Sequence, residues 1–295
     1  MKKYLTIDIG GSAIKYGVID EQLNFTSKGK VATPLDTIEN LLQTIGELVS
    51  NCKEPLAGLA VSMPGIIDNE QGYAYTGGAL SYIHEINFKD ELEAYTEMKV
   101  AICNDAKAAT LAEMGYGHLE GIANGIVVVL GTGIGGGVVI NNKLIKGTNF
   151  SAGEFSFIKG DVNDDSQDNL FAFTNGIGGV KKEIFKASGL ENIEGVEAFK
   201  LIKAGNKEVL AGMEAFCDKL AFHIYNLQVV LDVQRILIGG GISQEPMMIE
   251  LINEAADRKF GGKFNFIKKP EIMTCQFCND ANLIGALYNF KNIHE

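Results

Sequence analysis

The chain has 295 residues, of which 46% are hydrophobic and 21% charged, a composition that excludes a disordered chain and predicts about two globular domains. The net charge of −11 disfavours non-specific binding to nucleic acid, because attraction to phosphate supplies most of that affinity. No apolar run is long enough to span a membrane, and the five cysteines are expected to be reduced thiols in a cytoplasmic protein.

The first predicted elements are two strands, residues 3–9 and 14–19, joined by a tight turn. Asp8 stands near the end of the first strand and interrupts the apolar run, which is therefore not that of a secretory signal. The turn consists of Gly10, Gly11 and Ser12. A carboxylate beside a glycine turn suits the water shell of Mg²⁺ next to a phosphate, whereas the alternative is that Asp8 only hydrogen-bonds its own turn.

The next segments alternate between helix and strand. Residues 37–49 place leucine, isoleucine and valine on one face of a helix. A strand within residues 56–68 breaks at Pro64-Gly65, and residues 99–117 combine a strand that ends at Asn104-Asp105 with a following helix. By its position alone, Asp105 is equally suited to be a general base and to be the N-cap of that helix.

A second cycle of strand, glycine turn and strand lies within residues 124–147. Its turn contains a G-x-G-x-x-G pattern at Gly131, Gly133 and Gly136. A dinucleotide-binding fold needs a helix after this pattern, but β-like sequence follows here. The pattern therefore favours a hairpin whose amides point at a phosphate, and a plain β-turn is the alternative.

A third cluster of glycines ends another buried strand. A helix over residues 208–231 precedes this strand, which lies within residues 234–243. The strand stops at Gly239, Gly240 and Gly241. Glycine accounts for 35 of the 295 residues, well above its average share of about 7%, and its position at strand ends indicates backbone that approaches a ligand closely. The cycle of strand, glycine turn and strand thus occurs twice, as a repeat of architecture without sequence identity.

Six short motifs, in their order along the chain, resemble the ROK family of sugar kinases, which has the actin-like sugar kinase/Hsp70 ATPase fold. They are DIGGSAIKYGVID, MPGIID, NDAKAA, GTGIGGGVV, AGE and GGGIS. The resemblance covers nearly the whole chain and implies an α/β protein with two actin-like (ribonuclease H-like) domains and a ligand cleft between them. The smaller domain is predicted to comprise residues 1–116 and 282–295, and the larger one residues 117–281.

The resemblance also implies roles for individual residues. ATP would contact two phosphate loops and an adenosine segment, formed by Asp8, Gly10, Gly11, Ser12, Lys15, Gly131, Thr132, Gly133, Gly239, Gly240 and Gly241. Asp8 would also hold Mg²⁺. The sugar would contact Gly65, Gly78, Asn104, Asp105 and Glu154. Asp105 would be the catalytic base, because a sugar hydroxyl loses its proton when it is phosphorylated.

Two departures from the family pattern bear on metal and substrate. Phe157 stands where the family has a histidine that contacts sugar and ligates zinc, and residues 158–176 contain no cysteine, so no structural zinc is expected. Cys275 and Cys278 are a single Cys-x-x-Cys pair, and no second pair of cysteine or histidine residues accompanies them to complete a metal site. The segment TGGAL and the zinc-free AGEF motif resemble the β-glucoside kinase branch, whose members phosphorylate the 6-hydroxyl of the non-reducing glucose in cellobiose and related β-glucosides.

The sequence therefore predicts an ATP-dependent kinase acting on β-glucosides such as cellobiose. The alternatives are a glucokinase, an N-acetylmannosamine kinase, and a sugar-binding sensor without catalysis, against which the retention of Asp8 and Asp105 argues. A transcriptional repressor of the same family is disfavoured, because such proteins carry a winged-helix segment before the first phosphate loop and this chain is acidic. The expected partners are a small-molecule sugar and, from the resemblance, a second copy in a homodimer, with no nucleic acid and no membrane.

Overall fold

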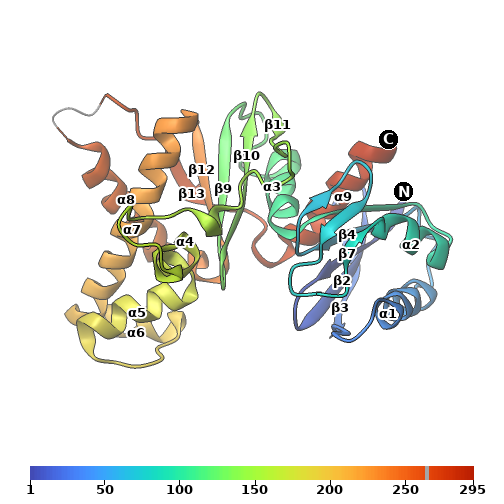
Figure 1. Cartoon of the computed structure of the whole chain (residues 1–295), viewed down its shortest axis with the longest axis horizontal. Helices are drawn as coiled ribbons and strands as arrows, with labels where there is room; N and C mark the ends of the chain where they lie inside the picture. Colours follow the sequence, from blue (N-terminus) through green and yellow to red (C-terminus); the bar gives the residue numbers. More distant parts are fainter. Residues whose placement is uncertain (263–265) are drawn as a thin grey trace. The chain divides into compact units, whose positions relative to one another are not determined.

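The computed structural model describes residues 1–262 and 266–295, and the chain forms two compact units (Figure 1). Unit 1 comprises Met1–Glu120, Lys146–Ser151 and Asp280–Glu295, and unit 2 comprises Gly121–Ile145 and Ala152–Asn279. Residues 263–265 of the predicted larger domain lie outside the described residues. Within the described ranges, no helix has both the length and the apolar character needed to cross a membrane.

Unit 1 is built on a five-stranded sheet in the order β3-β2-β1-β4-β8. Its strands are β1 (Lys3–Ile9), β2 (Ala13–Asp20), β3 (Phe25–Ala32), β4 (Leu59–Met63) and β8 (Val100–Asn104). The first three strands form an antiparallel meander, and β4 and β8 run parallel to β1. The register pairs Asp8 with Lys15, which confirms the predicted hairpin.

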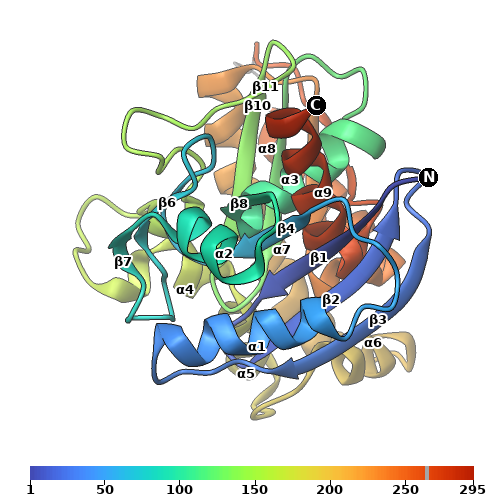
Figure 2. The same ribbon diagram turned by 90° about the vertical axis from the view of Figure 1, so that its right-hand side faces the viewer.

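Helices cover both faces of this sheet, which is why β1 is buried along almost its whole length. They are α1 (Ile38–Ser50), α2 (Phe88–Thr96), α3 (Asp105–Tyr116) and α9 (Ala281–His294). Successive side chains of a strand point to opposite faces. Leu5 accordingly joins the core cluster that contains Leu41 of α1, whereas Tyr4 packs against Phe290 of α9. Asp8 has the same parity as Tyr4 and lies on the α9 face, and Figure 2 shows α1 and α9 on either side of β1.

A smaller antiparallel sheet, in the order β5-β6-β7, completes unit 1. Its strands are β5 (Ile67–Asp68), β6 (Tyr73–Thr76) and β7 (His84–Ile86). The strand predicted within residues 56–68 is thus two strands, β4 and β5, because Gly65 turns the chain with a φ of +111°. The segment Thr76–Leu80, called the sugar segment below, begins at the last residue of β6.

Unit 2 repeats the topology of the larger sheet, in the order β11-β10-β9-β12-β13. Its strands are β9 (Gly125–Leu130), β10 (Ile134–Ile140), β11 (Lys143–Leu144), β12 (Arg235–Gly239) and β13 (Glu271–Thr274). Here β9, β10 and β11 form the antiparallel meander, and β12 lies parallel to both β9 and β13. The architectural repeat predicted from the two glycine turns is confirmed.

The helices of unit 2 pack around α7, whose predicted bounds differ from the observed ones by a single residue. The helices are α4 (Phe171–Asn175), α5 (Ile177–Ser188), α6 (Gly195–Lys203), α7 (Lys207–Leu231) and α8 (Pro246–Phe260). Short 3₁₀ turns occur at Phe155–Phe157, Gln167–Asn169, Gly241–Gln244 and Cys278–Asp280. Met213, Phe216 and Leu220 recur every three or four residues along α7 and are fully buried, so this helical face forms the centre of the unit 2 core.

Candidate active site

Asp8 is almost buried at the end of β1, and side chains from two other segments hold its carboxylate. Ser62 of β4 donates from Oγ to Asp8 Oδ1 at 3.0 Å, and Asn282 of α9 donates from Nδ2 to the same oxygen at 2.9 Å. The alternative that Asp8 only hydrogen-bonds its own turn is therefore wrong. Lys15 pairs directly opposite Asp8, so the two side chains share one face of the sheet.

A residue outside the turn Gly10–Ser12, which lies beside Asp8, holds it by a hydrogen bond. Thr33 donates from its hydroxyl to the Gly10 carbonyl at 2.6 Å. A Cβ added to Gly11 would lie 3.5 Å from the Cβ of Ala79, which is ordinary van der Waals contact. The turn predicted to bind phosphate therefore lies against the sugar segment within unit 1.

Asn104 ends β8 and connects α3 to the loop that follows β4. Its Oδ1 accepts the Lys107 amide at 3.1 Å, which makes Asn104 the N-cap of α3, and its Nδ2 donates to the Gly65 carbonyl at 2.9 Å. The N-cap alternative for Asp105 is therefore wrong, since Asp105 is the first helical residue. The Asp105 carboxylate accepts the Ala106 amide at 2.7 Å.

Two glycines bring the sugar segment onto this cap. Gly65 has a φ of +111°, and a Cβ there would lie 1.9 Å from the Thr76 carbonyl oxygen, so only glycine fits. Gly78 has a φ of +59°, and a Cβ there would lie 3.3 Å from the Gly65 nitrogen. Unit 1 therefore assembles four of the five predicted sugar residues, which are Gly65, Gly78, Asn104 and Asp105.

In unit 2, the predicted second phosphate loop is the hairpin turn between β9 and β10. The Gly131 amide donates to the Gly133 carbonyl at 3.0 Å, and β10 returns antiparallel to β9, so the dinucleotide-binding alternative is wrong. The Ile177 amide donates to the Gly131 carbonyl at 2.9 Å, which places the N-terminus of α5 at this turn. Amides at a helix N-terminus favour phosphate. The sequence prediction missed this helix end, although the glycine-rich run TNGIGG over residues 174–179 is its signal.

Glu154, the fifth predicted sugar residue, lies in unit 2 just before the 3₁₀ turn Phe155–Phe157. Ser156 attaches this turn to β10, because its Oγ accepts the Ile134 amide at 2.9 Å and lies 3.1 Å from the Ile134 carbonyl. A Cβ added to Gly133 would lie 2.8 Å from the same Oγ. Unit 2 thus brings the segment of Glu154 together with the predicted second phosphate loop.

The segment after Phe157 is organised by an asparagine. Phe157 itself is 71% exposed, whereas Asn169 is buried. The Asn169 Oδ1 accepts the amides of Gly160 and Asp161 at 3.0 and 2.7 Å, and its Nδ2 donates to the carbonyls of Asp161 and Asp164. Across residues 1–262 and 266–295, no three histidine, cysteine, aspartate or glutamate side chains are grouped to hold a metal ion. The expectation that this segment needs no zinc stays a prediction.

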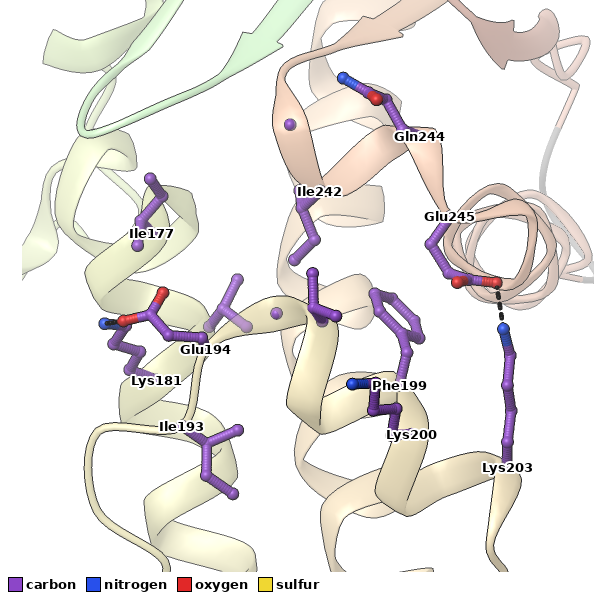
Figure 3. Close-up of a pocket in the computed structure, with 14 residues that line it drawn as sticks. Ile177, Lys181, Ile193, Glu194, Phe199, Lys200, Lys203, Ile242, Gln244 and Glu245 are labelled. Carbon is purple, nitrogen blue, oxygen red and sulfur yellow. Dashed lines mark hydrogen bonds and ion pairs between the residues drawn. The ribbon is translucent and has the colours of Figure 1, made fainter.

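A cavity of about 600 Å³ lies in unit 2 among α5, α6 and the 3₁₀ turn Gly241–Gln244 (Figure 3). Its apolar lining consists of Ile177, Val180, Ile193, Val196, Phe199 and Ile242. Two of the three lysines that line it form ion pairs, Lys181 with Glu194 and Lys203 with Glu245. A cavity of this size with apolar walls and few polar groups is typical of a small-molecule site.

Of the three glycines at the end of β12, Gly241 lines this cavity. A Cβ on Gly241 would meet no atom within 4 Å, whereas one on Gly240 would lie 2.0 Å from the Leu130 carbonyl oxygen. A Cβ on Gly239 would lie 3.1 Å from the Cys275 sulfur. Gly239 and Gly240 therefore allow close passage of the backbone, and Gly241 faces the cavity.

Known proteins resemble this chain along its whole length. The ROK family model matches residues 4–293. A protein named β-glucoside kinase from Listeria monocytogenes is 30% identical over 99% of this chain and 100% of its own, and an N-acetylmannosamine kinase from Haemophilus influenzae is 27% identical over 98% and 95%. The crystal structure of a ROK family protein from Streptococcus pneumoniae TIGR4 in complex with sucrose is 30% identical, covers 98% of each chain and has a TM-score of 0.88. This likeness confirms the predicted actin-like α/β fold class.

Proposed function

The chain belongs to the ROK family and is a sugar kinase, and from this premise we propose that it transfers the terminal phosphoryl group of ATP to the 6-hydroxyl of a glucosyl unit in β-glucosides such as cellobiose. The observation that carries the proposal is the assembly of Asn104, Gly65 and Gly78 around the start of α3, where Asp105 is the first residue. This arrangement offers a carboxylate beside a polar surface of backbone and amide groups, as the phosphorylation of a hydroxyl requires.

Asp105 would accept the proton of the 6-hydroxyl as the phosphoryl group is transferred. Among the described residues, Asn104 uses one of its two N–H groups for the Gly65 carbonyl, so the second N–H is available to a neighbouring sugar hydroxyl. Because Asn104 is also the N-cap of α3, its side chain is held in place before sugar binds, and positioning of this kind supplies most of the catalysis in phosphoryl transfer.

The amides of the two glycine turns and the N-terminus of α5 would bind the ATP phosphates. In the described part of the chain, both hydrogen bonds to Asp8 reach Oδ1, so Oδ2 fits a water molecule of a magnesium shell. One carboxylate is enough for Mg²⁺, which usually keeps several waters and the substrate's phosphates as ligands. When bound, the ion would neutralise phosphate charge. The apolar cavity beside Gly241 suits the adenosine.

The preference for β-glucosides is supported by Phe157 and by the relatives. A histidine can hydrogen-bond a free anomeric hydroxyl, whereas Phe157 presents an exposed apolar ring. A site built to pair a hydroxyl rejects a substrate that leaves its polar groups unpaired, and a site without those groups does not. The Listeria relative named β-glucoside kinase supports the same assignment. N-acetylmannosamine kinase is the second candidate, supported by the Haemophilus relative.

Steady-state ATP consumption with glucose, N-acetylmannosamine, cellobiose and gentiobiose tests the proposal. We expect kcat/KM for cellobiose to exceed that for glucose by at least about tenfold, equivalent to roughly 1.4 kcal/mol of differential transition-state binding, and we expect turnover to stop when Mg²⁺ is chelated. If glucose or N-acetylmannosamine is clearly the better substrate, the β-glucoside assignment fails while the kinase assignment survives.

A further inference from the structure

We propose that the ring of Tyr75, backed by Phe150, is the surface in unit 1 on which the aglycone of a β-glucoside rests during phosphorylation. This inference depends on the proposed function. The two rings are stacked, with centroids 5.5 Å apart and planes 24° apart, and Tyr73 packs edge-on against Tyr75 at 4.9 Å. The Tyr75 side chain is nevertheless 40% exposed, so the pair presents an aromatic surface to a ligand.

Hydrogen bonds connect Tyr75 to the candidate sugar site. The Tyr75 amide donates to the Ile66 carbonyl at 2.9 Å, and the Ile66 amide donates to the Thr76 hydroxyl at 3.1 Å. The neighbouring Gly65 carbonyl is the acceptor for Asn104. Tyr75 therefore stands one residue before the sugar segment, on a backbone that is bonded to the N-cap of α3.

The alternation of β6 determines which way Tyr75 points. Ala74 is completely buried and belongs to the core cluster of unit 1, so Tyr73 and Tyr75 lie on the opposite face of the small sheet. Within the described residues the Tyr75 hydroxyl makes no hydrogen bond. It is therefore available to a hydroxyl of a second sugar, while the ring offers an apolar face to its C–H groups.

Phe150 supplies an independent observation, because it adopts a conformation that bulky residues rarely adopt. Its φ is +58°, in the left-handed region, where the Cβ of a residue other than glycine lies too close to the following carbonyl oxygen. The segment Lys146–Ser151 belongs to unit 1, where Lys146 forms an ion pair with Glu70 at 2.6 Å. Strained residues of this kind cluster at ligand clamps. A glycine would suit the backbone better, so the ring itself is the reason for phenylalanine at this position.

A comparison of two substrates distinguishes the contribution of the aglycone surface from that of the rest of the site. Cellobiose carries a second ring beyond the anomeric oxygen, whereas methyl β-glucoside has the same ether oxygen and a single methyl group. We expect Tyr75→Ala to lower kcat/KM for cellobiose by about five- to tenfold and for methyl β-glucoside by less than about twofold, the scale of one lost aromatic contact. Tyr75→Phe keeps the ring and should retain most of the cellobiose activity.

Two further variants control for folding. Phe150→Gly relieves the left-handed strain, so it should unfold no more easily than the wild type and still lose part of the cellobiose preference. Tyr95→Ala removes another exposed tyrosine of unit 1, on α2. It should leave kcat/KM unchanged for both substrates.

The outcomes are distinguishable. An equal loss for both substrates in Tyr75→Ala, or no loss for either, overturns the aglycone surface while the kinase assignment stands. A wild type that phosphorylates glucose or N-acetylmannosamine but no β-glucoside overturns the proposed function, and the aglycone surface with it, before any variant is measured.

Discussion

The side-chain amide of Asn104 donates to the Gly65 carbonyl at 2.9 Å while its oxygen caps α3. One residue therefore joins the end of β8, the start of a helix and the loop after β4. Because Asn104 fills the cap position, the carboxylate of Asp105 is not needed to begin the helix. A substitution that removes the charge of Asp105 can thus report on chemistry without removing the cap.

Asp105→Asn should lower kcat by at least about 10²-fold, the low end for the loss of a positioned general base. Sugar affinity, measured by isothermal titration calorimetry, should remain close to that of the wild type, since the amide is isosteric with the carboxylate. Asp90→Asn is a matched control, because Asp90 lies in the first turn of α2. Equal turnover in wild type and Asp105→Asn would remove Asp105 from the mechanism.

Asn169→Ala should lower the free energy of unfolding by about 2 kcal/mol, because it removes the four hydrogen bonds that the buried Asn169 side chain makes to the backbone of this segment. Asn163→Ala, in the same segment but exposed, should change it by less than about 0.5 kcal/mol. Urea denaturation with and without added zinc measures both.

We also expect no stoichiometric zinc in the purified protein. One tightly held zinc per chain, lost only on unfolding, would contradict our account of residues 153–180.

Gly195→Leu should raise KM for ATP by at least about fivefold, since an added side chain in a filled site costs roughly 1–3 kcal/mol. Gly195 is the first residue of α6, and its Cβ would lie 3.7 Å from Ile242, so the longer side chain would enter the cavity. Gly262→Leu, where a Cβ would meet no atom within 4 Å, is the control. An unchanged KM for ATP in Gly195→Leu would mean that the adenosine binds elsewhere.

His223 should make the protein less stable in mild acid. Burial lowers the pKa of His223 to about 4; its Nδ1 has no hydrogen-bond partner in the described chain, and its ring stacks on Phe171 at 3.9 Å. Between about pH 6.5 and 4 the unfolded chain binds a proton that the folded chain does not. The contribution of His223 to the free energy of unfolding is therefore fully present above about pH 6.5 and is lost as the pH falls toward 4.

The comparison of His223→Phe with the wild type isolates this effect. From about pH 7.5 to pH 5 the wild type should lose roughly 2 kcal/mol more than the variant, which keeps a ring against Phe171 but cannot titrate. Urea denaturation at both values measures the difference. Parallel pH profiles for the two proteins would show that His223 is protonated in the folded state as easily as in the unfolded one.

Much of the fold is predictable from the sequence because its signals are local. The hairpin at Asp8, the break at Gly65 and the helix over residues 208–231 each depend on residues a few positions apart. The two glycine turns are predictable for the same reason, since glycine at a strand end allows backbone conformations that other residues rarely adopt.

Contacts between distant segments are not predictable in this way. Asn282 is the partner of Asp8 although 274 residues separate them, and no local pattern marks that pairing. The residues that line the cavity cannot be recognised in the sequence for another reason. Val180 and Phe199 recur at helical spacing, as ordinary core residues do. The left-handed backbone of Phe150 even contradicts local preference, because tertiary contacts override it there.

The position of α9 in the chain has a consequence for synthesis. Unit 1 is completed by residues after Asp280, which the ribosome makes only after the residues of unit 2. At about 5–20 residues per second, the interval between Ser151 and Asp280 is on the order of ten seconds. Throughout that interval the nascent sheet lacks Asn282 for Asp8 and leaves Tyr4 uncovered. The glycine turn beside Asp8, which we propose to bind phosphate, is therefore translated first, but its surroundings in unit 1 are completed last.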